Sequence, residues 1–269
     1  MDRTPESVAW KGALACCLLI TSATTAPAMA ADYVAIPAGA FVSVLSSPAG
    51  NDPVRVEPFA LRETPVTNAE FLTFVSARPE WRRDRIPAVF ADNSYLRRWS
   101  DPGAIGAQLG ANQAVTSVSW FAAQAFCEYE GARLPTWYEW EYVAAADESH
   151  ADARSDPSWR ARILSWYGKT SATPAPAVGG AANYYGARDM HGVIWEWVDD
   201  FNALFISADS RNQGDPDKLQ FCGAGAISLQ DKENFAVLMR IALLSSLAGV
   251  DTTENLGFRC ARNLSQDMK

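Results

Sequence analysis

The chain has 269 residues, of which 48% are hydrophobic and 11% are aromatic, and its formal net charge is −8. An acidic chain with no basic stripe argues against nucleic-acid binding, because nothing is placed to neutralise a run of phosphates. Only two histidines occur, His150 and His191, and their wide separation argues against a histidine-built zinc or non-haem iron centre.

The first thirty residues have the pattern of an export signal. The apolar run "ALACCLLITSATTA" is followed by Ala28-Met29-Ala30, which fits a small-x-small cleavage site. We therefore expect residues 1–30 to be a signal peptide and residues 31–269 to be one mature, periplasmic or secreted domain without a membrane span. The leading region is neutral instead of basic, so an ordinary N-terminal helix or a misassigned start is the alternative.

The beginning of the mature chain predicts short strands followed by a helix. Residues 32–45, "DYVAIPAGAFVSVL", and 54–63, "VRVEPFALRE", are rich in β-branched and aromatic side chains, which is typical of strands. Residues 64–77, "TPVTNAEFLTFVSA", change to a helical period, and Thr67 and Glu70 are spaced as a capping box.

Two further helices and a closing strand are predicted downstream. Residues 117–135 predict a helix capped by Ser119 and ended by Gly131, and Thr136 and Glu139 are spaced as a second capping box. Next come a Pro/Gly/Ala loop, the aromatic turn and strand "DMHGVIWEWVDDF", and the closing strand "ENLGFRCARN". Few helices and short, scattered strands indicate an irregular α+β domain with long loops.

These segments, in this order and spacing, resemble the formylglycine-generating-enzyme (sulfatase-modifying-factor) domain family. The motifs that carry the resemblance are "RETPVTNAEFLTFV", "VTSVSWFAAQAFCEYEGARLPTWYEWEYVAAA", "GARDMHGVIWEWVDDF" and "NLGFRCAR". The resemblance spans residues 33–263 and implies a single domain with a variant C-type-lectin-like fold. The best-known members use oxygen and copper to oxidise a substrate cysteine to formylglycine. Relatives include a pyoverdine-chromophore maturation enzyme and NirV, an accessory protein found with copper nitrite reductase; residues 81–96 and 220–247 most resemble the NirV-like group.

The copper ligands that the family would supply are missing from the sequence. The resemblance places two copper-binding cysteines shortly before "GFRC", and counting back without gaps puts those positions at Asp231 and Ala236. A linear bis-thiolate site needs two soft sulfur ligands. We therefore do not expect copper. An alignment gap could shift the register, but no second cysteine lies near Cys222 for the shift to reach.

Three cysteines follow the expected signal peptide: Cys127, Cys222 and Cys260. The resemblance implies a disulfide between Cys127 and Cys260, which leaves Cys222 as the odd thiol. Cys222 is either a small buried residue beside glycines or a reactive, candidate catalytic thiol, because its segment borders the family's substrate cleft.

The segment "DMHGVIWEW" is the candidate calcium loop. The resemblance implies that calcium is held by the side chains of Asp189 and Glu196 and by the backbone carbonyls of Gly192 and Ile194. Two carboxylates with a glycine between them can surround a hard cation with oxygens. Without the resemblance, Asp189 would be interpreted as a turn residue and Glu196 as an exposed strand position.

Two functional classes remain open. The first is an accessory or maturation factor for another exported protein, built on a lectin-like scaffold without the copper site and linked to nitrite reductase as NirV is. The alternative is an oxidase or modifying enzyme that acts on an exported protein or peptide-derived substrate, as the pyoverdine-maturation relative does.

Overall fold

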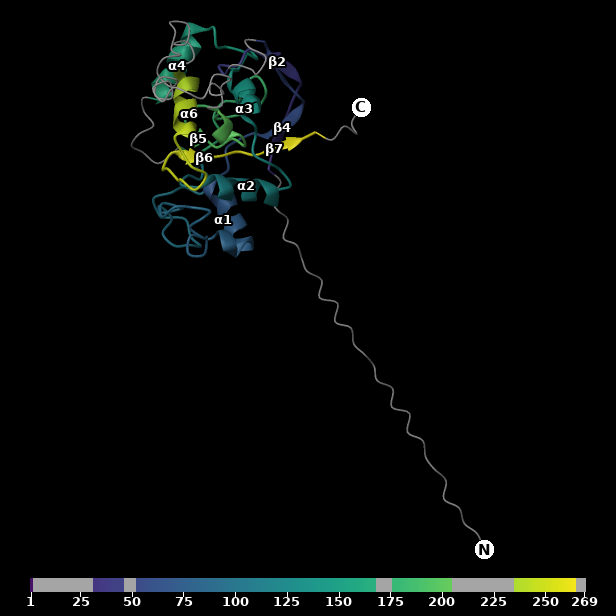
Figure 1. Ribbon diagram of the computed structural model, residues 1–269, viewed down its shortest axis with the longest axis vertical. Helices are drawn as coiled ribbons and strands as arrows, with labels where there is room; N and C mark the ends of the chain where they lie inside the picture. Colours follow the sequence, from purple (N-terminus) through teal and green to yellow (C-terminus); the bar gives the residue numbers. More distant parts are fainter. Residues whose placement is uncertain (2–30, 46–51, 168–175, 205–234, 265–269) are drawn as a thin grey trace, which may run out of the picture. The chain divides into compact units, whose positions relative to one another are not determined.

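The computed structural model of the protein describes residues 1, 31–45, 52–167, 176–204 and 235–264. Residues 1–31 and 32–269 form separate units, and the elements named below belong to the second. Its short strands and few helices confirm the expected α+β class (Figure 1).

The strands are two to four residues long and form three small sheets. They are β1 (Tyr33–Ile36), β2 (Gly39–Phe41), β3 (Val54–Val56), β4 (Phe59–Arg62), β5 (Trp195–Glu196), β6 (Leu256–Gly257) and β7 (Ala261–Asn263). The antiparallel sheet β1-β4-β7 brings the beginning and the end of the domain together, with Tyr33 opposite Arg62 and Phe59 opposite Asn263. The β2-β3 pair is antiparallel, whereas β5 and β6 pair in parallel. The strands predicted from residues 32–45 and 54–63 are confirmed.

Three helices begin where the sequence predicts. They are α1 (Asn68–Ala77), α2 (Trp120–Tyr129) and α3 (Trp137–Ala144), and the 3-10 turn η1 (Pro79–Trp81) follows α1. The Thr67/Glu70 and Thr136/Glu139 capping boxes are both present, and Ser119 caps α2 by accepting from the Ala122 amide. Each cap satisfies amide groups that a helix leaves unbonded in its first turn.

Further helical elements go beyond the sequence prediction. They are α4 (Pro157–Tyr167), the 3-10 turn η2 (Phe201–Ala203) and α6 (Phe235–Ser245). Helix α6 turns Val237, Arg240, Ile241 and Leu244 inward, which is the i, i+3, i+4, i+7 spacing of one helical face. In Figure 1, α4 and α6 lie in the same half of the domain as α3, and α1 and α2 lie in the other half.

Aromatic side chains fill the main core. Phe71 of α1 stacks on Phe126 of α2 at 5.7 Å, and Phe258 meets both rings edge-on. Burying each ring stabilises the fold by ~1.5–3 kcal/mol. A second, smaller apolar cluster is formed by Ala153, Trp159 and Ile163, with Trp166 packed against it.

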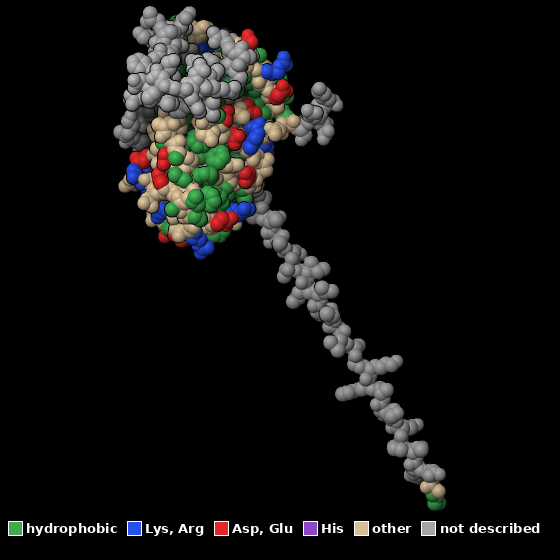
Figure 2. Space-filling view, in the orientation of Figure 1, with side chains coloured by type: hydrophobic (Ala, Val, Ile, Leu, Met, Phe, Trp, Pro, Cys, Tyr) green, Lys and Arg blue, Asp and Glu red, His purple; other side chains and the backbone are tan. Residues whose placement is uncertain are grey.

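The surface combines a patch of apolar side chains with charged ones. Figure 2 shows apolar side chains gathered in the part of the view where β6 and α2 lie, with acidic and basic side chains around them. Within the residues that the structure describes, no helix is both long and apolar enough to cross a membrane.

Candidate functional site

A buried ion pair joins the "WEW" and "GFRC" segments. Glu196 ends β5 and Arg259 follows β6, so the parallel pairing of these strands brings the two side chains together. The Arg259 Nη2 and Nε atoms lie 2.8 and 2.9 Å from the two Glu196 carboxylate oxygens, and neither residue is exposed. A bidentate pair of this kind is both strong and directional.

Strand β6 can approach this closely because it contains Gly257. A Cβ atom at Gly257 would lie 2.2 Å from the Val115 carbonyl oxygen, which is far inside van der Waals contact. The glycine of "GFRC" therefore lets β6 lie against the backbone before α2, and this places Arg259 beside Glu196.

Arg259 also binds the backbone of two other segments. It donates to the carbonyl oxygens of Arg62 and Glu63 at the end of β4, at 3.3 and 3.2 Å. It donates as well to those of Arg188 and Asp189, at 2.9 and 3.2 Å. One guanidinium thus fixes the start of the candidate calcium loop against the central sheet.

Helix α6 reaches the same centre through Arg240. The Arg240 guanidinium carbon lies 3.5 Å from the centroid of the Trp140 ring, and Arg240 donates to the Glu196 carbonyl oxygen. The Trp140 Nε1 atom in turn donates to the Glu196 carboxylate at 2.8 Å. Both oxygens of the Glu196 carboxylate thus accept hydrogen bonds from buried protein donors, which is the arrangement of a structural centre.

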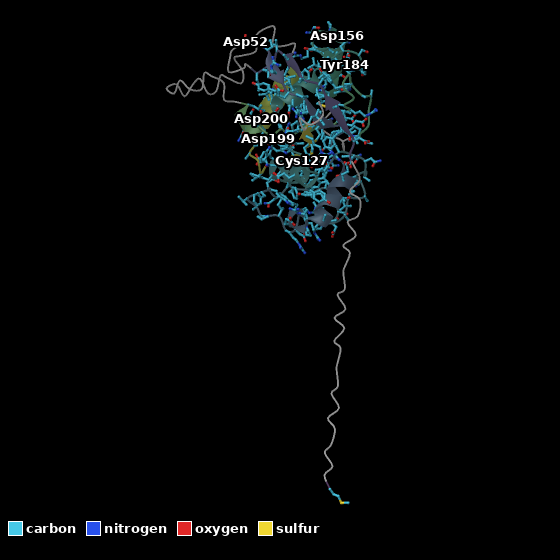
Figure 3. All side chains as sticks on the ribbon, turned by 90° about the vertical axis from the view of Figure 1, so that its right-hand side faces the viewer. Asp52, Cys127, Asp156, Tyr184, Asp199 and Asp200 are labelled. Atoms are coloured by element: carbon cyan, nitrogen blue, oxygen red, sulfur yellow. A yellow bond between two sulfur atoms is a disulfide. The ribbon has the colours of Figure 1, made fainter. Side chains whose placement is uncertain are left out.

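Cys127 and Cys260 are joined by a disulfide, with their Cα atoms 5.5 Å apart. Cys127 is in α2, among the densely packed side chains of Figure 3, and Cys260 directly follows Arg259. Both residues are fully buried. Neither offers a thiolate to a metal.

The positions expected to correspond to the copper ligands lie at the edge of what the structure describes. Cys222 and Asp231 fall outside the described residues, and Ala236 lies in the first turn of α6. The role of Cys222, either a small buried residue or a reactive thiol, therefore stays a prediction.

The expected calcium ligands point to separate partners. Asp189 accepts from the Gly179 and Gly180 amides at 2.6 and 3.1 Å, whereas the Glu196 carboxylate is neutralised by Arg259. Among the residues that the structure describes, no three acidic, His or Cys side chains form a metal-binding group. A cation at Glu196 would lie beside the Arg259 guanidinium, and this arrangement opposes calcium binding there. The calcium site stays a prediction, which a lower melting temperature with a chelator would support.

The two histidines have different environments. His191, within the candidate calcium loop, donates from Nε2 to the Ala144 carbonyl oxygen at 2.8 Å and contacts the rings of Trp140 and Trp159. Burial lowers the pKa of His191 to about 4, so it is neutral at physiological pH. His150 is exposed and contacts Asp147.

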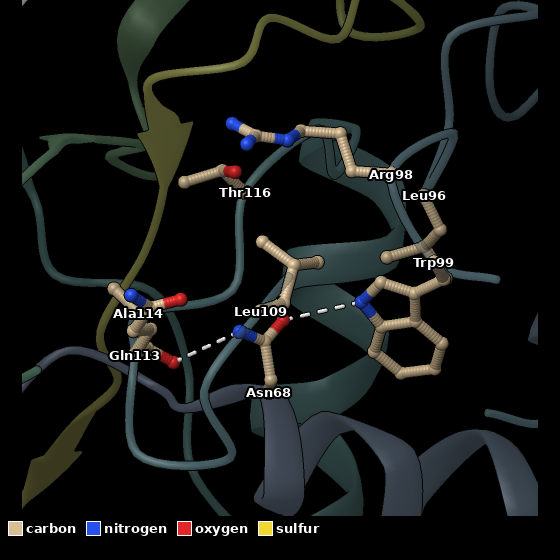
Figure 4. Close-up of a pocket in the computed structure, with 8 residues that line it drawn as sticks. All are labelled: Asn68, Leu96, Arg98, Trp99, Leu109, Gln113, Ala114 and Thr116. Atoms are coloured by element: carbon tan, nitrogen blue, oxygen red, sulfur yellow. Dashed lines mark hydrogen bonds between the residues drawn. The ribbon is translucent and has the colours of Figure 1, made fainter. Parts of the chain in front are cut away.

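A small cavity beside α1 is structural (Figure 4). Its volume is about 10 Å³, which is room for about one water molecule. The Asn68 side chain closes one side, accepting from Trp99 Nε1 at 3.1 Å and donating to the Gln113 carbonyl oxygen at 3.2 Å. Arg98 and Thr116 lie on the opposite side of the cavity in Figure 4. This cavity is too small for an organic substrate.

The sulfatase-modifying factor enzyme 1-like domain matches residues 20–264, nearly the whole chain. The protein belongs to this family. Membership confirms the resemblance that the sequence motifs carry, and the few helices and short strands fit it. The described centre lies where those motifs meet, because Trp140, Glu196 and Arg259 come from three of them.

Relatives within the sulfatase-modifying factor family carry names of different kinds. Formylglycine-generating enzyme of Streptomyces coelicolor is 29% identical over 256 residues, covering 78% of this chain and 80% of its own length. The Mus musculus protein named inactive C-alpha-formylglycine-generating enzyme 2 is 28% identical over 276 residues, covering 85% and 84%. Hercynine oxygenase of Mycolicibacterium smegmatis is 30% identical over 197 residues, covering 64% of this chain and 46% of that protein. Membership thus leaves the reaction open.

Sequence reasoning missed the role of Arg240. The available signal was a single arginine inside the apolar stretch 235–247. A charge on the buried face of a helix requires a compensating partner, and here that partner is the Trp140 ring together with the Glu196 carbonyl.

Proposed function

We propose that this protein is a maturation or accessory factor for another exported protein and works without the two-cysteine copper site of formylglycine-generating enzymes. The supporting observation is the cysteine inventory. Three cysteines follow the expected signal peptide, and two of them are joined in the buried disulfide. Only Cys222 is left, and a bis-thiolate copper site needs two sulfur ligands.

The family provides precedent for a scaffold kept without the parent activity. The sulfatase-modifying factor family includes a protein named inactive C-alpha-formylglycine-generating enzyme 2, to which this chain is 28% identical across most of both lengths. A fold can persist while its site changes. The buried centre at Glu196 has the character of such a scaffold, because its polar groups bind one another.

The expected location and client complete the proposal. A signal peptide over residues 1–30 would take the protein to the periplasm or the exterior. The resemblance of residues 81–96 and 220–247 to the NirV-like group makes an exported nitrite reductase the first client to examine. A strain that lacks this protein should then make nitrite reductase of reduced specific activity at unchanged abundance, restored by wild-type protein.

Copper binding gives the sharpest biochemical test. The mature protein should take up no stoichiometric copper(I) in competition with a chromogenic chelator, and it should not accelerate oxygen consumption with a cysteine-containing peptide. The double variant Asp231→Cys with Ala236→Cys is the matched control, because it restores thiols at both expected positions. Tight copper(I) binding by the unmodified chain would overturn the proposal.

The second candidate function is a modifying enzyme that uses Cys222. It is favoured by one observation, namely that Cys222 is the cysteine outside the disulfide in the mature chain. Under this alternative, Cys222→Ser abolishes complementation of the deletion strain, and labelling finds a thiolate with lowered pKa. Under the accessory function, Cys222→Ser complements as well as wild type.

A further inference from the structure

A pocket of about 260 Å³ lies between α4, the turn after α3 and the loop 180–193. Residues 146–148 form one wall, α4 a second, and the loop a third. In Figure 3, Asp156 at the start of α4 and Tyr184 of the loop lie at the same end of the domain. The described residues that line the pocket all lie between positions 146 and 193, and the proposal for this pocket does not rest on the proposed function.

Two separate apolar clusters supply the inner walls. Trp159 and Ile163 of α4 belong to the smaller apolar cluster, whereas Ala187 and Met190 belong to the main core. The pocket lies between these two clusters and is lined by side chains of both. All four side chains are less than 10% exposed, so these walls are preformed.

Trp166 completes the apolar lining through a close contact with the loop. Gly192 has φ +86°, and a Cβ atom there would lie 2.8 Å from the Trp166 ring. The ring also stacks on His191 at 6.5 Å. A glycine at position 192 therefore lets the α4 aromatic side chain close one side of the pocket.

The charged lining residues are mostly acidic. Asp147, Glu148 and Asp189 each carry one negative charge and Arg162 carries one positive charge, so together they sum to −2. Both terminal nitrogens of Arg162 are held by Glu148, at 3.0 Å each. Among the lining residues that the structure describes, the one cationic side chain is thus already neutralised, which disfavours an anionic ligand.

We propose that this pocket binds a small organic cation, namely an ammonium group on a compact apolar body. The apolar body lies against Trp159, Trp166 and Met190, and the positive group lies toward Asp147 and Asp189. Apolar walls with a few oriented charges are the usual composition of a small-molecule site. The volume of about 260 Å³, against about 10 Å³ for the one-water cavity beside α1, leaves room for a ligand the size of an arylalkylamine.

A substitution at Asp147 and one at its neighbour His150 should change the affinity for a cation in opposite directions. Asp147 lines the pocket, and its carboxylate contacts the exposed His150. Asp147→Asn keeps an oxygen for the Ser149 and His150 amides but removes the charge. His150→Asn removes the neighbouring partial positive charge. We expect about two- to fivefold weaker binding of a cation in the first variant and stronger binding in the second, as for partly exposed charges.

The experiment compares 2-phenylethylammonium with 3-phenylpropionate by isothermal titration or tryptophan fluorescence on the mature chain. The cation should bind with Kd on the order of 1 mM, as nine non-hydrogen atoms allow, and at least about tenfold more tightly than the anion. Trp166→Ala should weaken binding by at least about tenfold. Melting curves identify variants that fail to fold, and the two polar variants at Asp147 and His150 keep the test valid if Trp166→Ala unfolds. Equal binding of both probes, no binding, or equal affinity in the Asp147 and His150 variants overturns the proposal.

Discussion

Arg259→Met should lower the free energy of unfolding by about 5 kcal/mol and Glu196→Gln by about 3 kcal/mol, the two ends of the range for breaking a buried ion pair. The ranking follows from the groups that each change leaves behind. Without Arg259, the buried Glu196 carboxylate loses its cation and keeps the Trp140 Nε1 donor, and four carbonyl oxygens lose the guanidinium. Without the Glu196 charge, the guanidinium still has those four carbonyls.

The assay is urea unfolding followed by tryptophan fluorescence, arranged as a double-mutant cycle. The double variant should cost at least about 2 kcal/mol less than the sum of the single variants, because neither leaves an unpaired charge once both are gone. If Arg259→Met is too unstable to measure, Arg259→Lys gives a smaller loss, since an ammonium cannot replace the five donors of a guanidinium.

The exposed pair Arg78–Glu80 is the matched control for this cycle. Its side chains are 54% and 56% exposed, and their separation is 2.9 Å, much like that of the buried pair. Its coupling should be at most about 0.5 kcal/mol. Equal coupling in the two pairs, or additive losses at Glu196 and Arg259, would refute the reasoning that burial gives this contact its strength.

Three further predictions concern the disulfide, a helix cap and an exposed ion pair. Cys127→Ala with Cys260→Ala should lower stability by up to about 5 kcal/mol, the chain-entropy value for a 133-residue separation, and reductant should lower the melting temperature of wild type but not of this variant. Thr136→Ala should cost about 1 kcal/mol in urea unfolding, because the Glu139 amide loses its cap, and a loss below the error of measurement would contradict the capping role. The hydrogen bond from His150 holds the pKa of Asp147 at about 2, so the stabilisation is present above the ordinary value of 3.8 and lost as pH falls through about 2. His150→Asn should return that pKa toward 3.8 in a carboxyl NMR titration, and an unchanged titration would exclude the imidazole as the cause.

The sequence predicts the local structure of this protein well because local structure has local causes. Each of the two capping boxes and the Ser119 cap spans only four residues, and all three are present in the structure. The strands near the N-terminus follow from β-branched and aromatic composition. The Cys127–Cys260 pairing has no such local cause, and only the family resemblance predicts it.

Helix α4 carries the same kind of local signal. Asp156 accepts from the Ser158 amide, and Pro157 occupies the first helical position, which is a common start to a helix. Trp159, Ile163 and Trp166 then follow at i, i+4 and i+7. The many charged residues around these three side chains obscure the apolar spacing in the sequence.

The candidate site could not be read from the sequence in the same way. The family motif predicts a calcium ion at Glu196, and this stays a prediction; the contact that the structure shows is with Arg259, 63 residues downstream. A calcium ion or an arginine can each neutralise a buried carboxylate. The motif alone therefore does not show which of the two Glu196 contacts. The contact with Arg259 depends on the pairing of β5 with β6, which the sequence motif alone does not show.

The C-terminal motif also determines when the domain can fold. Residues 256–263 supply β6, Arg259, Cys260 and β7, and their partners lie 61 to 204 residues earlier in the chain. A nascent chain leaves the ribosome N-terminus first, so it lacks all of these contacts until residues 256–263 have emerged. Contacts this distant in sequence make folding slow, because a long loop must close before they form. The protein should therefore remain a substrate for holding chaperones until then and reach its native state only after this motif is free of the ribosome.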